Sequence, residues 1–227
     1  MIGIIFAMEE ELSSFLKDKE IIEKKEIYEL KFYKLNINSK DIIIVESGVG
    51  KVNSARTTQI LIDYFKPSIV LNVGVAGGVD NNIKILDIII GEKLVQYDFD
   101  ITEFNHNKGY IPKIGDYIES DNKLIDKIYN LGKELNINIH KGTIATGDRF
   151  ITDINVRLDI NKEFNALCNE MEGASIAQVC NLCNIPFLVI RSISDSIEHN
   201  TVLKYEEFLE QSCNQLTNFL DKIIAIL

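Results

Sequence analysis

The stretch Phe187-Leu-Val-Ile-Arg-Ser-Ile-Ser-Asp195 begins with four apolar residues in a row and ends on polar and charged ones. A continuous apolar run is typical of a strand that is covered on both faces of a sheet. We therefore predict a buried strand over Phe187–Ile193. Similar runs rich in isoleucine and valine recur along the chain and predict further strands at Ile2–Phe6, Ile42–Val45, Ile69–Val73, Asp87–Ile90 and His140–Ala145.

Helical patterns occupy the segments between the predicted strands. They cover Glu9 to about Lys19, Lys51–Phe65, Asn122–Leu135, Gly173–Asn184 and Tyr205–Ile226. Strands that alternate with helices predict an α/β fold, here in three layers with a mixed, largely parallel central β-sheet flanked by helices. The mixture of polar and apolar residues over Tyr28–Leu35 instead predicts an antiparallel excursion or an edge hairpin.

The length and the position of the prolines favour one domain. A chain of 227 residues, 46% of them hydrophobic, buries roughly 70% of its unfolded surface, which is enough core without disulfides or metal. No Pro/Gly/Ser-rich linker interrupts the pattern, and the three prolines fall at predicted junctions: Pro67, Pro112 and Pro186. Residues 1–227 are therefore predicted to form a single domain.

Charge and hydropathy limit the partners and the location. The net charge of -10 opposes the phosphate-dominated electrostatics of nucleic acid binding. No apolar run approaches the ~20 residues that a membrane span needs. The apolar N-terminus, Met1–Met8, lacks a basic segment and leads directly into three glutamates, unlike a signal peptide. We expect a cytoplasmic protein that binds neither nucleic acid nor membrane.

The four cysteines do not predict a disulfide framework or a metal site. In a cytoplasmic chain of this length they are expected to be reduced. Cys180-Asn-Leu-Cys183 has the spacing of a redox or zinc motif, but it lies in an apolar helical pattern with no second pair and no nearby histidine. This context favours buried thiols, and no metal is predicted.

Five clusters of glycine, polar and charged residues lie near the ends of predicted strands: Ala7–Glu11, Gly74–Gly78, Thr146–Ile151, Glu170–Gly173 and Arg191–Asp195. Ligands of open α/β sheets bind at the carboxyl ends of the strands, so these clusters predict the position of a site. The glycines match neither the dinucleotide motif G-x-G-x-x-G nor the Walker A loop. Kinase, ATPase and dehydrogenase functions are therefore disfavoured together.

Each cluster also has an explanation without chemistry. Carboxylates favour the N-terminal end of a helix dipole, glycines suit tight turns, and a strand-end aspartate often caps a turn. Successive helical side chains point about 100° apart, so at most one of Glu9, Glu10 and Glu11 faces a common pocket. That glutamate could act as a general base, and an aspartate at a pocket rim, such as Asp195, could donate a proton.

Taken together and in order, the clusters resemble the 5'-methylthioadenosine/S-adenosylhomocysteine nucleosidase family of the purine nucleoside phosphorylase superfamily. The resemblance covers nearly the whole chain, and its specificity comes from the colinear set rather than from any one motif. The motifs that carry it are Gly3-Ile-Ile-Phe-Ala-Met-Glu-Glu-Glu11, Ser47-Gly-Val-Gly-Lys-Val52, Asn72-Val-Gly-Val-Ala-Gly-Gly78, Thr146-Gly-Asp-Arg-Phe-Ile151, Asn169-Glu-Met-Glu172 and Arg191-Ser-Ile-Ser-Asp195.

The resemblance implies hydrolysis of the N-glycosidic bond of 5'-thio-substituted adenosines, giving adenine and a thioribose without a cofactor. Glu11 falls at the carboxylate that activates water, and Asp195 at the acid that delivers a proton to adenine N7. Glu172 falls at the residue that binds the ribose hydroxyls, with Met171 packed beside the sugar. The two carboxyl groups would divide base and acid roles as in glycosidases.

The resemblance also assigns the surroundings of the substrate. Phe150 would stack on adenine, whose edge is recognised by the backbone around Ile151, and Tyr205 lies where the family places an aromatic near the 5'-thio group. Other positions would line or support the pocket: Met8, Val49, Ala76, Gly77, Arg191 and Ser194. Two positions near the proposed site depart from the family: Phe6 replaces a common glycine, and Val75 replaces a small hydroxyl residue.

The resemblance implies a homodimer in which Ile101, Phe104 and Pro112 reach into the alkylthio pocket of the partner. The apolar and aromatic character of the segment from Phe99 to Pro112 suits a buried interface. The reaction would serve methionine salvage, clearance of S-adenosylhomocysteine or autoinducer supply, and the sequence leaves these three open.

Three alternatives remain open at this point. A phosphorylase of the same superfamily would need a cationic site near the N-terminal strand end, where this chain has Glu9, Glu10 and Glu11. A futalosine hydrolase would share the fold. A non-catalytic nucleoside-binding protein would be expected to lack one of the three carboxylates at Glu11, Glu172 and Asp195. The aspartate at 195 suits adenine, since relatives that act on 6-oxopurines tend to have asparagine there.

Overall fold

The computed structural model describes residues 1–197 and 202–227, and the side chains of residues 1–197 and 208–227. The strands are β1 (Ile2–Phe6), β2 (Glu23–Ile27), β3 (Leu30–Ile37), β4 (Lys40–Glu46), β5 (Ile69–Gly78), β6 (Ile88–Gln96), β7 (Ile118–Glu119), β8 (Ile139–Thr146), β9 (Ala166–Glu170) and β10 (Phe187–Asp195). The helices are α1 (Glu9–Leu16), α2 (Lys51–Phe65), α3 (Asn122–Glu134), α4 (Ile154–Phe164), α5 (Gly173–Leu182) and α6 (Val202–Ile226), with a 3-10 turn η1 (Thr102–Phe104).

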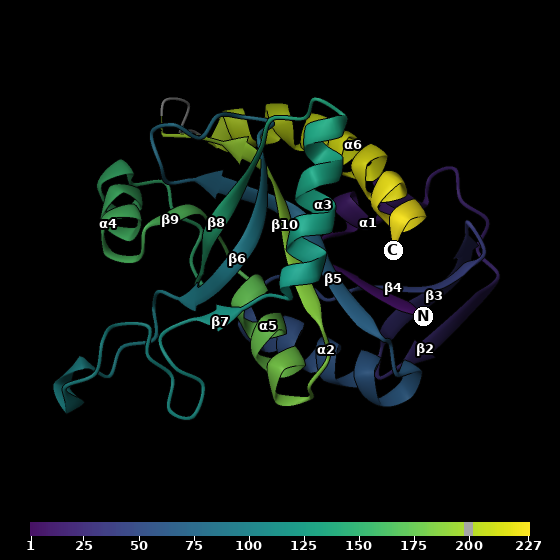
Figure 1. The fold of residues 1–227 in the computed structure, drawn as a ribbon, viewed down its shortest axis with the longest axis horizontal. Helices are drawn as coiled ribbons and strands as arrows, with labels where there is room; N and C mark the ends of the chain where they lie inside the picture. Colours follow the sequence, from purple (N-terminus) through teal and green to yellow (C-terminus); the bar gives the residue numbers. More distant parts are fainter. Residues whose placement is uncertain (198–201) are drawn as a thin grey trace.

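All strands join one mixed sheet in the order β10-β6-β8-β9-β5-β1-β4-β3-β2, with β7 paired to β6 (Figure 1). β10 also pairs with β5, so the strands from β10 to β5 close into a ring and β1, β4, β3 and β2 extend from it. The central pairs β1–β4, β1–β5 and β10–β5 are parallel, whereas β10–β6 and β5–β9 are antiparallel. This mixed α/β architecture confirms the predicted fold class.

The predicted elements are present, and β2, β7, β9 and α4 lie outside the predicted ranges. β1 and α2 begin and end at the predicted residues, and β2, β3 and β4 form antiparallel pairs where an excursion was expected over Tyr28–Leu35. β9 and α4 were not predicted. β9 has five residues, and α4 has a weakly amphipathic sequence, so neither gives a strong periodic signal. Both elements contribute to the site described below.

The continuous apolar strands are explained by burial on both faces of the sheet. Ile4 and Ile5 are adjacent in β1 and fully buried, yet they belong to opposite cores. Ile4 packs with residues of α1, α3 and α6, and Ile5 with residues of α2 and α5. Figure 1 shows α3 and α6 over one face and α2 and α5 beneath the other. Helices α1, α3 and α6 therefore form one outer layer of the fold and α2 and α5 the other, while α4 packs beside β9 in a separate cluster.

A long connection between β6 and β7 projects away from the sheet (Figure 1). It contains η1, whose Phe104 is 75% exposed.

None of the described helices is long and apolar enough to cross a membrane.

Candidate active site

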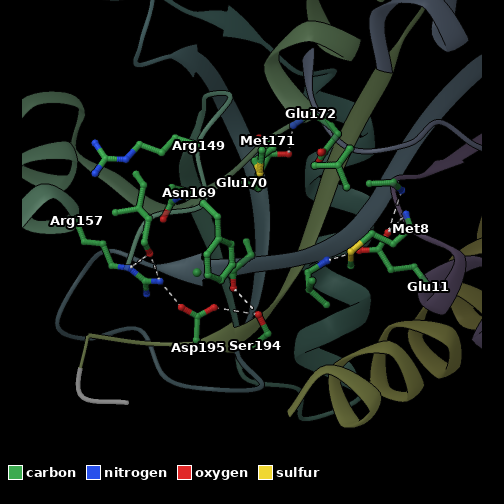
Figure 2. A pocket seen from close by; sticks show the side chains of 17 residues that line it. Met8, Glu11, Arg149, Arg157, Asn169, Glu170, Met171, Glu172, Ser194 and Asp195 are labelled. Atoms are coloured by element: carbon green, nitrogen blue, oxygen red, sulfur yellow. Dashed lines mark hydrogen bonds and ion pairs between the residues drawn. The ribbon is translucent and has the colours of Figure 1, made fainter. Parts of the chain in front are cut away.

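A pocket with about 530 Å³ of empty space, part of it open solvent, lies where several strands end (Figure 2). This volume is in the range of small-molecule sites. Predicted residues on its wall are Met8, Glu11, Val49, Ala76, Gly77, Phe150, Ile151, Met171, Glu172, Ser194 and Asp195. Ala7, Val75, Arg149, Arg157, Asn169 and Glu170 complete the lining.

Glu11 is the one glutamate of its triplet that turns into the protein. Glu9 and Glu10 are exposed, whereas Glu11 is 3% exposed. Its Oε2 accepts hydrogen bonds from the backbone N–H groups of Ala7 (2.9 Å) and Met8 (3.2 Å), and its Oε1 accepts one from Val75 N–H (2.9 Å). The carboxylate thus completes the first turn of α1 and is fixed against β5.

Opposing effects act on the ionisation of Glu11. Burial raises its pKa because it disfavours the charged form, whereas the nearby Arg191 and the three backbone N–H groups lower it. Burial has the larger effect, so the pKa of Glu11 is raised above its ordinary value. A carboxylate with a raised pKa and fixed orientation is suited to accept a proton from water.

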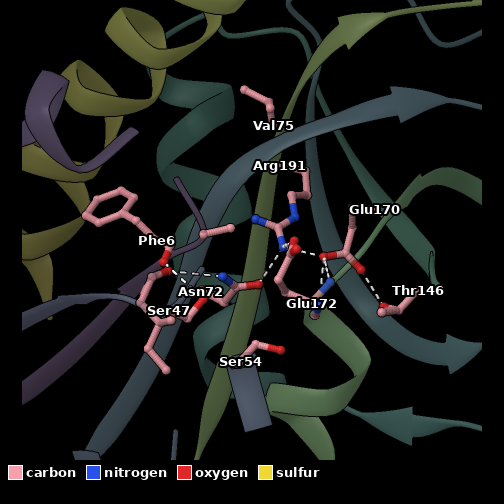
Figure 3. Close-up of polar contacts among 12 residues, drawn as sticks. Phe6, Ser47, Ser54, Asn72, Val75, Thr146, Glu170, Glu172 and Arg191 are labelled. Carbon is pink, nitrogen blue, oxygen red and sulfur yellow. Dashed lines mark hydrogen bonds and ion pairs between the residues drawn. The ribbon is translucent and has the colours of Figure 1, made fainter. Parts of the chain in front are cut away.

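Arg191 lies behind the pocket wall and is fully buried in β10 (Figure 3). Its Nη2 donates to Asn72 Oδ1 (2.6 Å) and forms an ion pair with Glu170. Burial lowers the pKa of Arg191, but the carboxylates of Glu170, Glu172 and Glu11 outweigh this effect and raise it. Arg191 therefore supports the pocket electrostatically and does not line it.

Glu170 organises the start of α5 beside Arg191 (Figure 3). Its Oε2 accepts from the backbone N–H groups of Glu172 (3.0 Å) and Gly173 (2.7 Å), and its Oε1 accepts from the Thr146 hydroxyl. A carboxylate at this position satisfies helix N–H groups that would otherwise be unpaired. Because this role occupies Glu170, Glu172 is the carboxylate of the pair that remains for a ligand.

Glu172 is 5% exposed, and its Oε1 accepts from Gly50 N–H (2.9 Å). Burial and the adjacent Glu170 raise the pKa of Glu172 to about 7, against the lowering effect of Arg191. Figure 2 shows Glu172 and Met171 on the pocket wall across from Ser194 and Asp195. An acceptor beside a thioether is suited to bind hydroxyl groups next to an apolar surface.

Asp195 ends β10 and is 3% exposed. The register between β10 and β5 shifts at Ile193/Asp195, so Asp195 lies opposite Gly77. Irregularities of this kind redirect side chains and are common next to active sites. Asp195 Oδ1 accepts from the Ser194 hydroxyl (3.1 Å), and Oδ2 forms an ion pair with Arg157. Arg157, on α4, was not among the predicted site residues.

The loop after β8 carries Phe150, 49% exposed, and Ile151, 1% exposed. It is fixed at the rim by Asp148, which accepts from Lys51 N–H (2.8 Å) and donates its own N–H to Asp98 (2.9 Å). The Lys51 ammonium pairs with Asp98 (2.6 Å). The ends of β6 and β8 and the start of α2 are therefore joined beside the pocket.

Other predicted site residues lie outside this pocket. Ile101, Phe104 and Pro112 are in the β6–β7 connection and do not line it, and the Tyr205 side chain lies outside the described residues. Of the two departures from the family, Phe6 points away from the pocket and packs on Phe15, with ring centroids 5.8 Å apart. Val75 lines the pocket.

The donor set around the pocket does not resemble a metal centre. Over the ranges with described side chains, no group of three or more histidine, cysteine, aspartate and glutamate residues could hold a metal ion. The four cysteines are free thiols.

The sequence model of the Phosphorylase superfamily matches residues 1–225. A 5'-methylthioadenosine/S-adenosylhomocysteine nucleosidase of Staphylococcus haemolyticus is 36% identical over 230 residues, covering 100% of both chains. The chain belongs to this nucleosidase family. The family likeness extends to solved structures, and two examples come from Helicobacter pylori.

A nucleosidase of the same name from that organism, bound to butyl-thio-DADMe-Immucillin-A, has a TM-score of 0.95 and 35% identity, covering 100% of this chain and 98% of its own. A futalosine hydrolase of Helicobacter pylori has a TM-score of 0.94 and 35% identity, covering 100% of this chain and 97% of its own. Solved structures at the same distance from this chain therefore have names that give different substrates.

Proposed function

We propose that this nucleosidase family member hydrolyses the N-glycosidic bond of 5'-methylthioadenosine and S-adenosylhomocysteine, with 5'-deoxyadenosine as an additional candidate substrate. The observation that carries the proposal is one pocket with Glu11 and Asp195 buried on separate parts of its wall and Glu172 across from Asp195 (Figure 2). The names of its relatives support the substrate class. We further propose that residues 1–227 act as one catalytic domain in the cytoplasm.

The proposed chemistry follows from the bond that breaks. Departure of adenine leaves positive charge on the ribosyl centre, so the base must be protonated and water must attack the opposite side of the sugar. Asp195 would give its proton to adenine N7 while the electron pair of the C–N bond moves to the purine. Glu11 would take a proton from water as the new C–O bond forms, and Glu172 would accept hydrogen bonds from the ribose hydroxyls.

The same residues favour water over phosphate as the nucleophile. The attacking side is lined by Glu11, with Glu172 nearby, and the Arg191 behind them is already paired with Glu170. Of the two arginines on the pocket wall, Arg157 is paired with Asp195 and Arg149 lies in the loop that carries Phe150. Figure 2 shows Arg149 on the opposite side of the pocket from Glu11, so a phosphate that approaches beside Glu11 would meet carboxylates rather than a cationic site.

We expect adenine release from 5'-methylthioadenosine and S-adenosylhomocysteine at the same rate with and without phosphate. The assay separates free adenine by chromatography and includes 5'-deoxyadenosine, inosine and futalosine as alternative substrates. Release only in the presence of phosphate would assign a phosphorylase. If futalosine released hypoxanthine and the thio-nucleosides released no adenine, the protein would be a futalosine hydrolase instead.

We also propose a homodimer in which Ile101, Phe104 and Pro112 complete the alkylthio pocket of the partner. Phe104 supports this proposal because a phenylalanine 75% exposed on a projecting connection is unusual unless another surface covers it.

Phe104→Asp is expected to shift the protein toward monomer and to raise KM for 5'-methylthioadenosine about tenfold, because interface aromatics carry much of the binding energy. Sedimentation velocity and steady-state kinetics would measure both effects. Tyr28→Asp is a matched control, since Tyr28 is 63% exposed on the distant β2–β3 turn. A monomeric wild-type protein with full activity would contradict the dimer proposal.

A further inference from the structure

Arg157 connects three parts of the site through one buried guanidinium group. It is 1% exposed. Its Nε and Nη2 donate to the Ile151 carbonyl (3.0 and 2.7 Å), its Nη1 donates to the Gly78 carbonyl (3.3 Å), and Nη2 also pairs with Asp195. The contacts belong to the loop after β8, the end of β5 and the end of β10, which meet at the pocket (Figure 2).

The backbone at Gly77 leaves the space that this guanidinium occupies. A Cβ atom at position 77 would lie 3.1 Å from Arg157 Nη2 and 3.2 Å from its Cζ, closer than ordinary van der Waals contact. Gly77 also faces Asp195 across the β5–β10 pair. The glycine, the arginine and the aspartate therefore form one packed unit in the pocket wall.

The contacts around Asp195 show how its two carboxyl oxygens are held. Oδ2 is bound by Arg157, and Oδ1 accepts from the Ser194 hydroxyl. Arg157 can only donate, so its contact with Oδ2 becomes charge-assisted when Asp195 is a carboxylate, the form it would have after its proton has moved to a leaving base. Charge-assisted hydrogen bonds of this type are stronger than neutral ones.

We propose that Arg157 is a positioning residue for proton donation, an inference that rests on the proposed function. It holds Asp195 in register with the base-recognition loop at Ile151. It also pairs with the carboxylate formed when the Asp195 O–H bond breaks, the N7–H bond forms on the purine and the C–N electron pair departs with the base. Arg157 itself does not touch the reacting atoms.

A change of leaving group distinguishes a role of Arg157 in proton donation from a purely structural role. A p-nitrophenolate leaves without protonation, so cleavage of a p-nitrophenyl glycoside of 5-methylthioribose does not need the acid. Loss of Arg157 should then slow adenine release and spare nitrophenolate release. A collapsed pocket would slow both reactions alike.

The test compares Arg157→Met and Arg157→Lys with wild type on both substrates. We expect Arg157→Met to lower kcat for 5'-methylthioadenosine about 30-fold, within the range that general-acid catalysis contributes, with KM changed less than about threefold. Nitrophenolate release should stay within about threefold of wild type. Arg157→Lys, which keeps the charge, should recover part of the adenine rate. Arg56→Met, at an exposed arginine of α2, is the matched control.

A double-mutant cycle keeps the proposal testable if Arg157→Met does not fold or if the nitrophenyl substrate is not cleaved. In an Asp195→Asn background, Arg157→Lys should change kcat less than about twofold, because the two residues act as a unit. Equal losses on both substrates, an unchanged adenine rate, or full additivity in the cycle would overturn the proposal. A wild-type protein that releases no adenine would instead refute the proposed function.

Discussion

Replacing Asp195 with asparagine is expected to lower kcat for 5'-methylthioadenosine by about 10³-fold, within the range that general acids contribute, and to change KM only a few-fold. Asparagine has the same shape and can still accept from Ser194, but it has no acidic proton to give to the purine. A loss confined to kcat would show that the interaction is made in the transition state and not in the ground state.

The measurement is steady-state adenine release, with substrate binding checked by calorimetry. Asp63→Asn is a suitable control because Asp63 lies on the exposed side of α2 and hydrogen-bonds only Gln59 among the described contacts. If the Asp195→Asn protein turned over substrate at the wild-type rate, Asp195 would not be the proton donor.

Local sequence rules placed one glutamate of the Glu9–Glu11 triplet and Asp195 at the site edge of the sheet, and the family resemblance selected Glu11 within the triplet. Helical spacing limits the Glu9–Glu11 triplet to one inward carboxylate, and the structure selects Glu11 because its oxygens meet the N–H groups at the start of α1 and Val75. Asp195 ends one of the most apolar strands of the chain. A strand buried on both faces brings the residue at its carboxyl end to the site edge of the sheet.

Arg157 could not be predicted in the same way, because its role depends on groups distant in sequence. Its carboxylate partner lies 38 positions away, and one of its carbonyl partners, Gly78, lies 79 positions away. The helix that carries it has no strong apolar periodicity. A buried arginine in an otherwise polar segment gives no signal until the carboxylate that neutralises it is known.

Two residues that the sequence analysis placed near the pocket, Arg191 and Phe6, do not line it in the structure. Successive side chains of β10 point to opposite faces of the sheet. The Arg191 side chain contacts Asn72 and Glu170, behind the pocket wall. Phe6 ends β1 with its ring in the core against Phe15. In a sheet that is buried on both faces, a one-residue change of position reverses the side on which a side chain lies.

Gly74 shows how closely the basic and acidic groups behind the pocket are packed. A Cβ atom at this position would lie 2.3 Å from Arg191 Nη1 and 2.6 Å from Glu11 Oε1. The glycine therefore allows Arg191 and Glu11 to share one space beside β5. This closeness explains why the arginine acts on the ionisation of Glu11.

Replacing Glu11 with glutamine is expected to lower kcat for 5'-methylthioadenosine by about 10³-fold, because the amide cannot take a proton from water. The amide N–H₂ group would also face backbone donors where the carboxylate now accepts from Ala7, Met8 and Val75. A modest loss of unfolding free energy, about 1–3 kcal/mol, is therefore expected as well. Glu10→Gln is the matched control, since Glu10 is the exposed neighbour.

The pH dependence of the wild-type protein tests the same assignment. Glu11 and Glu172 must both be ionised to act, and burial raises both pKa values, that of Glu172 to about 7. Activity is present above these pKa values, so kcat/KM should fall as the pH is lowered through about 7. An exposed glutamate would titrate well below this range. A profile that stays flat down to about pH 5 would contradict the requirement for an ionised Glu172. A Glu11→Gln protein with wild-type kcat would remove Glu11 from the mechanism.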